Sequence, residues 1–534
     1  MLYTVLSSTY HITKQEEDTM IHLGKDVKLN IKPILVTLRH DYVFEGPCRM
    51  GKDFELTREF DDMVNQELLK GANEEIAENL TSPHFNVLEP YWADRNEEFL
   101  ITPEMLNEMT ADKDQVDVYL VGPMGRLSDL MIDFAQKAQK PMVLIPGPQC
   151  MQTIMAASTR ARGLETYAYR TWKETVDFLE VLRAAKMLRE TRVLCAARFG
   201  TTRSVSDMGN FVSLEHVTDV LGTQFSFVNI HELLDQTHIG KSGENYTLPG
   251  RAALNPTEED VKEMEALADD LIGNAQECDM TREEVLNSER FYITVKKMLD
   301  YYGCNAFAAP CPDACATRRL NEEHITFCLT HSLLGEMGIP SACEYDIPAC
   351  LSIAVLSCLA DAPAYMGNTT HDAKAMEGGR YGLSPFFHTD IDDKCLDVVK
   401  ADPDNIVLTW HAVPRRNMRG WDAPKAPYAI RPFAASGFGV TLRYDFTQDA
   451  GTPITMCRIS PDCSKLFVAK GEIVGGVGYQ DYSCSEGVFF RVKDGNDFFQ
   501  KQLEVGNHVP LVYGDCFEQV CALGKHLGLE VITA

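Results

Sequence analysis

Short apolar runs alternate with amphipathic helical stretches over the first part of the chain. Runs rich in branched side chains, each flanked by turn residues, lie at 33–38, 116–121 and 141–146. Residues 127–138 carry apolar side chains at helical spacing, with Ser128 as a suitable N-cap, and a longer helical stretch covers 171–189. Strands that alternate with helices are typical of a parallel sheet, so this pattern predicts a first α/β domain.

The alternation starts again after this helix. Predicted strands cover 191–197, 225–229 and 305–309, with a helix at 258–272 between the second and the third. This pattern predicts a second α/β domain.

Beyond about residue 400 the apolar residues recur with a period of two, which is typical of strands. Alternating runs separated by Gly- and Asp-containing turns lie at 428–433, 439–445, 455–459 and 488–492, and a helix at 517–527 follows. This part predicts an antiparallel β-barrel or sandwich.

The whole pattern therefore predicts an α/β fold: two α/β domains with parallel sheets, followed by a C-terminal antiparallel β-barrel or sandwich domain. Several domains are expected because single hydrophobic cores stop growing at roughly 250–300 residues, and the chain has 534 residues. The expected boundaries are an N-terminal arm at 1–29, domains at 30–190 and 191–365, and the β-rich domain at 366–534.

The candidate functional residues lie on either side of an apolar run at 347–360. Glu344 and Asp346 come just before it, where the N-terminus of a helix favours negative charge, and Asn368 and His371 come after it. The run is too short to span a bilayer and predicts a core helix. The carboxylates could meet the amide and the imidazole in one cleft, or they could simply cap a core helix whose ends are solvated.

Four segments resemble motifs of the L-fucose isomerase-like sugar isomerases, the family of L-fucose and L-arabinose isomerase-type enzymes. The segment 342–347, Ala-Cys-Glu-Tyr-Asp-Ile, is similar to the family's acidic motif, and 363–368 stands where the family has a second acidic ligand. Segment 408–414 resembles its His-Cys-Gly-type turn, with Ala-Val replacing Cys-Gly, and 506–515 resembles its C-terminal His motif. The motifs keep the family's order, and the resemblance covers residues 30 to 534.

The resemblance implies Mn²⁺ or Mg²⁺ held by Glu344, Asn368 and His508, with His411 touching substrate hydroxyls. Glu344 would be both ligand and base. Asn368 stands where the family usually has Asp, so it would be a neutral ligand or substrate contact and could not transfer protons. Asp346 or a water would then take that role. The resemblance also implies a homo-oligomer, a trimer or a hexamer.

Arg415, Arg416 and Arg419 form a basic cluster just after His411. They predict either a solvated loop or a site for an anionic group on the substrate, because Arg forks match carboxylate, phosphate and sulfonate oxygens. In the second case these arginines, His411 and His371 would bind substrate.

The amino-acid composition limits the classes of molecule that the protein is expected to bind. The net charge is −28, with 78 acidic and 50 basic residues, which argues against nucleic acid or an anionic membrane as partner. The N-terminus has neither the basic start nor the apolar centre of a signal peptide, so a cytoplasmic enzyme is expected.

Seventeen cysteines are present, and their spacings follow no known metal-ligand pattern. We expect them to be small buried hydrophobic residues of a protein in a reducing compartment. Seven of them lie close together in sequence: Cys304, Cys311, Cys315, Cys328, Cys343, Cys350 and Cys358.

The predicted function is metal-dependent aldose–ketose isomerisation through an enediolate. A divalent metal bridging two sugar oxygens stabilises that intermediate, and a nearby carboxylate moves the proton. Two alternatives stay open. One is a metal-dependent lyase or epimerase acting on a sugar that could be anionic, and the other is a catalytically inactive sugar-binding relative.

Overall fold

The computed structural model describes residues 21–37, 57–93, 102–122, 128–198, 210–239, 254–371, 380–384, 387–391 and 393–534. No helix within these ranges combines the length and the apolar character needed to cross a membrane.

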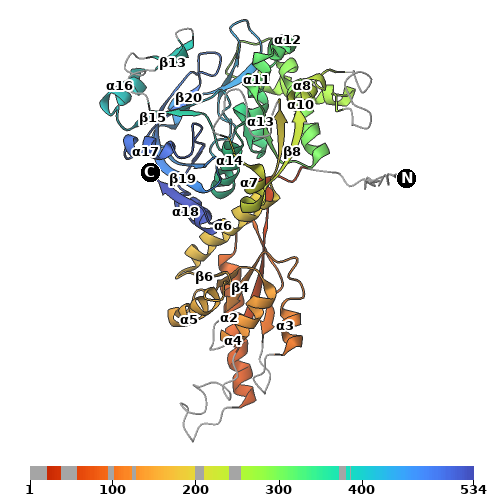
Figure 1. The fold of residues 1–534 in the computed structure, drawn as a ribbon, viewed down its shortest axis with the longest axis vertical. Coiled ribbons are helices and arrows are strands. Elements are labelled where there is room, and N and C mark those ends of the chain that lie inside the picture. The colour runs from red at the N-terminus through yellow and green to blue at the C-terminus, as the bar shows by residue number, and fades with distance from the viewer. Residues whose placement is uncertain are drawn as a thin grey trace, which may run out of the picture.

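The first sheet is parallel, as predicted, and has six strands. Its strands are β1 (Leu29–Val36), β2 (Phe85–Val87), β3 (Tyr91–Ala93), β4 (Val118–Gly122), β5 (Met142–Leu144) and β6 (Thr166–Ala168). Around it lie α2 (Arg58–Asn79), α3 (Pro103–Met109), α4 (Ser128–Ala138) and α5 (Gln149–Arg160). This part forms the lower lobe in Figure 1. Helix α6 (Trp172–Glu190), which begins at a capping box made by Thr171 and Glu174, leads from the lobe into the second sheet.

The second sheet is four-stranded and parallel, with the order β11-β10-β7-β8. Its strands are β7 (Arg192–Ala197), β8 (Gln224–Asn229), β10 (Ala306–Ala308) and β11 (Ser341–Ala342). Its helices are α7 (Leu214–Leu221), α8 (Ile230–Asp235), α9 (Glu258–Asn274), α10 (Arg282–Tyr302), α11 (Cys311–Ala316), α12 (Arg319–Glu323) and α13 (Cys328–Met337). Because the strands are parallel, the loops after β10 and β11 meet at one edge of the sheet.

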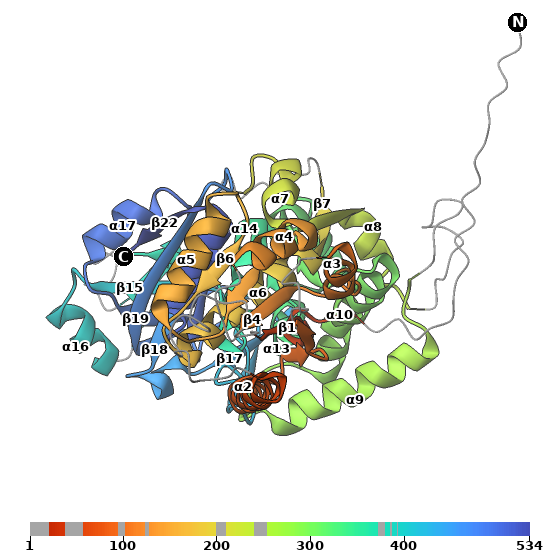
Figure 2. The same cartoon turned by 90° about the horizontal axis from the view of Figure 1, so that it is seen from below.

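The predicted core helix is α14 (Ile347–Ala360), which begins and ends at the predicted residues. Its side chains from Ile347 to Cys358 are all buried. The helix packs against α6 and against strands of the C-terminal sheet. In Figures 1 and 2 the helices of the second sheet lie on one side of α14 and the C-terminal strands lie on the other. A helix that is apolar all round is therefore required here.

The C-terminal sheet is antiparallel over most of its length and has the order β12-β15-β20-β19-β18-β21, with β22 parallel to β19. Its strands are β12 (Asn368–Thr370), β15 (Ile406–Trp410), β18 (Pro453–Ile459), β19 (Lys465–Val477), β20 (Gly487–Arg491), β21 (Leu511–Tyr513) and β22 (Glu530–Thr533). The sheet closes on itself, because Tyr365 and Leu511 exchange two backbone hydrogen bonds of 2.8 Å and Asn368 bridges to His508. This closing seam between β12 and β21 carries two of the predicted site residues.

Several further elements of the C-terminal part lie around this barrel. They are the hairpin β13 (Arg380–Ser384) and β14 (Phe387–Asp390), and the helices α16 (Asp393–Ala401), α17 (Gly495–Gln502) and α18 (Phe517–His526). Helix α18 confirms the predicted closing helix.

Two strands predicted for the C-terminal sheet lie elsewhere. β16 (Tyr428–Pro432) and β17 (Val440–Tyr444) pair antiparallel with each other, but β16 then pairs parallel with β9 (Glu277–Cys278) of the second unit. Tyr428 and Ile430 are buried in the core of that unit, and the Tyr428 hydroxyl donates to the Leu271 carbonyl of α9 (2.6 Å). A period of two identifies a strand but not its partner, so the pattern alone could not place this hairpin.

Candidate metal centre

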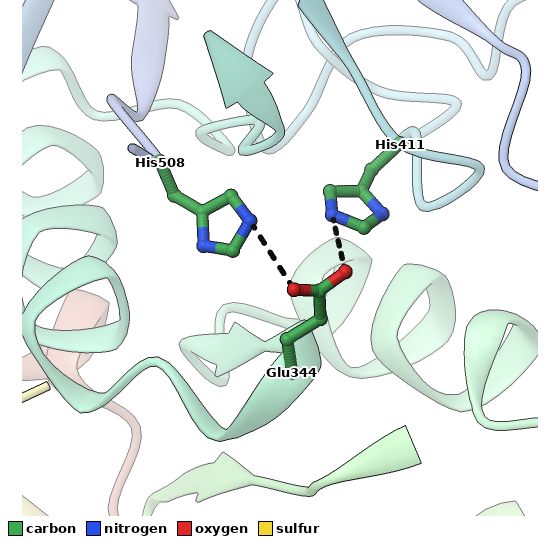
Figure 3. Close-up of side chains that lie close together, drawn as sticks. All are labelled: Glu344, His411 and His508. Carbon is green, nitrogen blue, oxygen red and sulfur yellow. Dashed lines mark ion pairs between the residues drawn. The ribbon is translucent and has the colours of Figure 1, made fainter. Parts of the chain in front are cut away.

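Three ligand-type side chains converge where the second sheet meets the barrel (Figure 3). Glu344 follows β11, His411 follows β15, and His508 lies just before β21. Each offers one donor atom, and the three donor atoms lie within 4.8 Å of one another. His411 Nε2 is 3.5 Å from Glu344 Oε1, and His508 Nε2 is 3.8 Å from Glu344 Oε2.

The backbone at Glu344 is held in an unusual conformation. Glu344 and Tyr345 have φ of 58° and 66°, a left-handed region that residues other than glycine seldom adopt. The turn is anchored on both sides: the Tyr345 amide donates to the Ala309 carbonyl (3.0 Å), and the Tyr345 carbonyl accepts from the Asn210 side chain (2.7 Å). Such strain persists only where surrounding contacts enforce it, and it concentrates at functional sites.

His508 is oriented by a buried ion pair. Its Nδ1 is 2.7 Å from Asp346 Oδ2, and Arg458 Nη1 donates to the same oxygen at 2.7 Å and to the His508 carbonyl at 2.7 Å. Burial alone raises the pKa of Asp346, but the charge of Arg458 and the contact with His508 lower it to about 2. An ionised Asp346 accepts a hydrogen bond from Nδ1 of His508, which leaves Nε2 facing Glu344. Burial opposes a charge on His508, but the contacts with Asp346 and Glu344 outweigh it and raise its pKa. A metal ion at Nε2 would therefore bind in competition with a proton.

His411 is held through its backbone. The Tyr365 hydroxyl donates to the His411 carbonyl (2.6 Å) and accepts from the His411 amide (2.8 Å). Burial, with smaller contributions from His508 and His331, lowers the pKa of His411 well below its usual value. The imidazole is therefore neutral, which is the form that binds a metal.

Asn368 lies beside His411 at the barrel seam. Its amide nitrogen donates to His411 Nε2 (3.2 Å), and its amide oxygen accepts from the Asn507 side chain. Rotating the amide by half a turn would bring the oxygen to the same place as a neutral ligand. Gly367 lets this segment approach β15 closely, because a Cβ there would lie 2.6 Å from the Trp410 carbonyl carbon.

The donor set fits a divalent metal ion. Donors bound at about 2.0–2.2 Å to one ion lie roughly 3–4 Å apart, and the distances of 3.5 and 3.8 Å from Glu344 to the two imidazoles agree with this geometry. Among the described residues, His508 Nε2 is a buried polar atom without a hydrogen-bond partner, and a bound cation would satisfy it. Two imidazoles and one carboxylate are ligands typical of transition metals. Glu344, His411 and His508 therefore form a candidate metal-binding triad.

The other residues predicted for the site lie against different partners. His371 Nε2 contacts the Pro403 carbonyl (3.2 Å). Arg415 is fully buried and donates to the carbonyls of Val413 and Ser341, and Arg416 forms a two-point ion pair with Glu336 at 2.7 and 2.8 Å. Arg419 has a side chain 62% exposed and pairs with Asp449 (2.5 Å). A substrate role for these four residues stays a prediction.

Sequence reasoning missed two residues that position the site. Arg458 is the single charged residue of β18, whose residues from Ile454 to Ile459 are all buried. A lone charge in such a run was the available signal, because buried charges need a partner. Tyr365, which holds the backbone of His411, gave no comparable signal.

Comparison with known proteins adds a distant similarity. No protein-family model matches the chain. Sulfoquinovose isomerases of Priestia aryabhattai and Priestia megaterium are each 26% identical to it over 281 residues, which is 52% of this chain and 53% of the relative. The chain thus spans about half the length of these curated relatives in the matched region. The similarity supports a relationship to sugar isomerases without singling out the L-fucose isomerase type.

Proposed function

We propose that this protein is a metal-dependent sugar isomerase that interconverts an aldose and a ketose. The observation that carries the proposal is the convergence of Glu344, His411 and His508 on one point, with a buried imidazole nitrogen left for a cation. The similarity to sulfoquinovose isomerases supports the same reaction class. The bound cation would polarise the neighbouring carbonyl and hydroxyl oxygens of the open-chain sugar and stabilise an enediolate.

Glu344 is the proposed proton carrier. Its side chain is 20% exposed, so a sugar can reach the carboxylate. Asp346 is a poor candidate, because Oδ2 accepts from Arg458 and contacts His508 while Oδ1 accepts from the Ala349 amide (2.8 Å). Asn368 has no proton to transfer at neutral pH. Glu344 would therefore remove the proton from one carbon and return it to the next, and Asp346 would act by holding His508.

The proposed metal is a first-row transition ion such as Mn²⁺ in preference to Mg²⁺. Mg²⁺ prefers oxygen ligands and keeps several waters, whereas two imidazoles favour softer ions. His411 joins the ligand set in this proposal, although the sequence predicted it as a substrate contact. Asn368 would offer a neutral fourth ligand.

The first substrate to test is sulfoquinovose, because both curated relatives bear that name. Its sulfonate requires a cationic partner in the site. Arg416 and Arg419 are poor candidates for binding the sulfonate, because the guanidinium group of Arg416 pairs with Glu336 and that of Arg419 pairs with Asp449. The homo-oligomer implied by the family resemblance also remains a prediction, which light scattering can check.

The test is proton NMR in heavy water with Mn²⁺-loaded protein. An isomerase converts sulfoquinovose into a ketose and introduces solvent deuterium beside the carbonyl. Exchange or epimerisation without ketose formation would instead support the epimerase alternative. Binding of sugar with neither result would support the inactive relative, for which Asn368 in place of an acid is the supporting observation.

Asn368→Asp should tighten Mn²⁺ binding by about 10-fold, because it places a second carboxylate beside His411. Isothermal titration calorimetry measures the affinity. Asn507→Asp is the matched control: it adds the same charge on the far side of Asn368 from His411, so it should tighten binding much less. Equal effects of the two variants would mean that only general charge matters and that Asn368 does not face the metal.

A further inference from the structure

Two of the clustered cysteines meet directly behind the metal centre. Cys311 begins α11 after β10, and Cys343 follows β11 immediately before Glu344. Their sulfur atoms are 3.4 Å apart, and both are free thiols. Cys343 is buried, whereas Cys311 is partly exposed. An accessible thiol that a peroxide can reach, in contact with a second thiol that can resolve it, is typical of a redox-sensing cysteine pair.

The backbone links this thiol pair to Glu344. The Ala309 carbonyl accepts from the Cys311 amide (3.1 Å) and from the Tyr345 amide (3.0 Å), so the loops after β10 and β11 share one anchor. Cys311 is flanked by Pro310 and Pro312, which fix two backbone torsions around it. Movement needed to join the sulfurs would therefore occur largely in the Cys343–Glu344 segment, whose backbone is already strained.

We propose that Cys311 and Cys343 form a reversible disulfide on reaction with a peroxide, and that this bond displaces Glu344 and weakens metal binding. The inference rests on the proposed metal site. A disulfide has a sulfur–sulfur distance of about 2.05 Å, so the sulfurs must approach each other by more than an ångström from their present contact. Metal ligands need to be held to about 0.5 Å, and Glu344 is the residue next to Cys343.

The chemistry consumes one hydrogen peroxide for each disulfide. The Cys311 sulfur attacks one peroxide oxygen, the O–O bond breaks, and the departing hydroxide leaves as water with the thiol proton. Cys343 sulfur then attacks the sulfenic acid, the S–O bond breaks, and the second hydroxide leaves as water with the Cys343 proton. The two sulfurs lose two electrons, and the peroxide gains them. A dithiol reductant reverses the reaction.

The experiment uses the full-length protein, reduced and then treated with hydrogen peroxide. Peptide mapping under non-reducing conditions should find a Cys311–Cys343 cross-link. Titration with Mn²⁺ alone should show affinity lowered by about 10-fold or more, with recovery after dithiothreitol. Cys311→Ser should keep its Mn²⁺ affinity after peroxide. Cys315→Ser, which removes an exposed thiol on the same helix, should lose affinity as the unmodified protein does.

Each outcome decides a separate point. Absence of the cross-link, or a cross-link with unchanged Mn²⁺ affinity, would overturn the switch while leaving the metal site intact. Equal loss of affinity in Cys311→Ser would assign the effect to another oxidised group and would also overturn it. Failure of the reduced protein to bind Mn²⁺ would overturn the metal site and the switch together. Lack of isomerase activity with metal binding intact would count against the proposed reaction alone.

Discussion

Replacing Glu344 by glutamine should lower Mn²⁺ affinity by at least about 100-fold and abolish isomerisation. The substitution keeps the shape of the side chain but removes the single negative charge among the three donors. Loss of a group that merely supports a ligand costs 10- to 100-fold in metal affinity, and Glu344 would be a ligand itself. It would also be the proton carrier, so turnover should not return at saturating metal.

Calorimetry with Mn²⁺ and the NMR assay measure the two effects separately. Glu322→Gln is the matched control, since it makes the same change at a glutamate whose side chain is 67% exposed on α12, and it should leave both quantities unchanged. Weak binding with turnover restored by excess Mn²⁺ would make Glu344 a ligand but not the base. A Glu344→Gln protein that binds Mn²⁺ normally would contradict the site.

Asp346→Ala should lower the free energy of unfolding by about 3–5 kcal/mol, because it leaves Arg458 buried without a counter-charge. Both side chains are at most 1% exposed. The pKa of Asp346 is about 2, compared with an ordinary 3.8. A lowered pKa in the folded state means that the stabilisation is fully present above pH 4 and is lost as the pH falls toward 2. The loss in free energy of unfolding caused by Asp346→Ala should therefore be largest at neutral pH.

Urea unfolding at pH 7 measures this loss. Asp269→Ala removes a carboxylate from the exposed pair with Arg282, and it should change stability only slightly because surface ion pairs contribute little. The double variant Asp346→Ala/Arg458→Met should recover part of the stability, since no unpaired charge remains. Its Mn²⁺ affinity should stay low, because His508 has lost the carboxylate that orients it. A double variant no more stable than Asp346→Ala would contradict the ion-pair explanation.

Elements that depend on local chemistry could be predicted from the sequence. Helix α14 begins and ends at the predicted residues, because an apolar run with Asp346 as N-cap and Pro348 in its first turn has few other conformations. The parallel sheets followed from strands alternating with helices. The hairpin of β16 and β17 was wrongly grouped with the barrel, since its partner β9 is about 150 residues away in sequence.

The candidate site could be predicted in part. The motifs identified Glu344, His411 and His508, and the structure brings the three side chains together as a candidate metal-binding triad. The substrate role predicted for His411 stays a prediction. The proton-transfer role predicted for Asp346 stays a prediction, and in the structure its carboxylate contacts Arg458 and His508. Its position depends on how α14 packs against β18, a contact between segments more than 100 residues apart.

The sequence by itself determined which segments become helices and strands and which residue types can bind a metal, because backbone propensities and side-chain chemistry are local. Only the tertiary structure decided which of those residues meet. Closure of the barrel brings Asn368 to His508, and the docking of the barrel against the second sheet brings His411 and His508 to Glu344. The same packing buries Arg415 and Arg416 against the second unit. These contacts form because the apolar faces of the barrel and of the second sheet must be buried. A local sequence pattern shows that a face is apolar, but it does not show which other face packs against it.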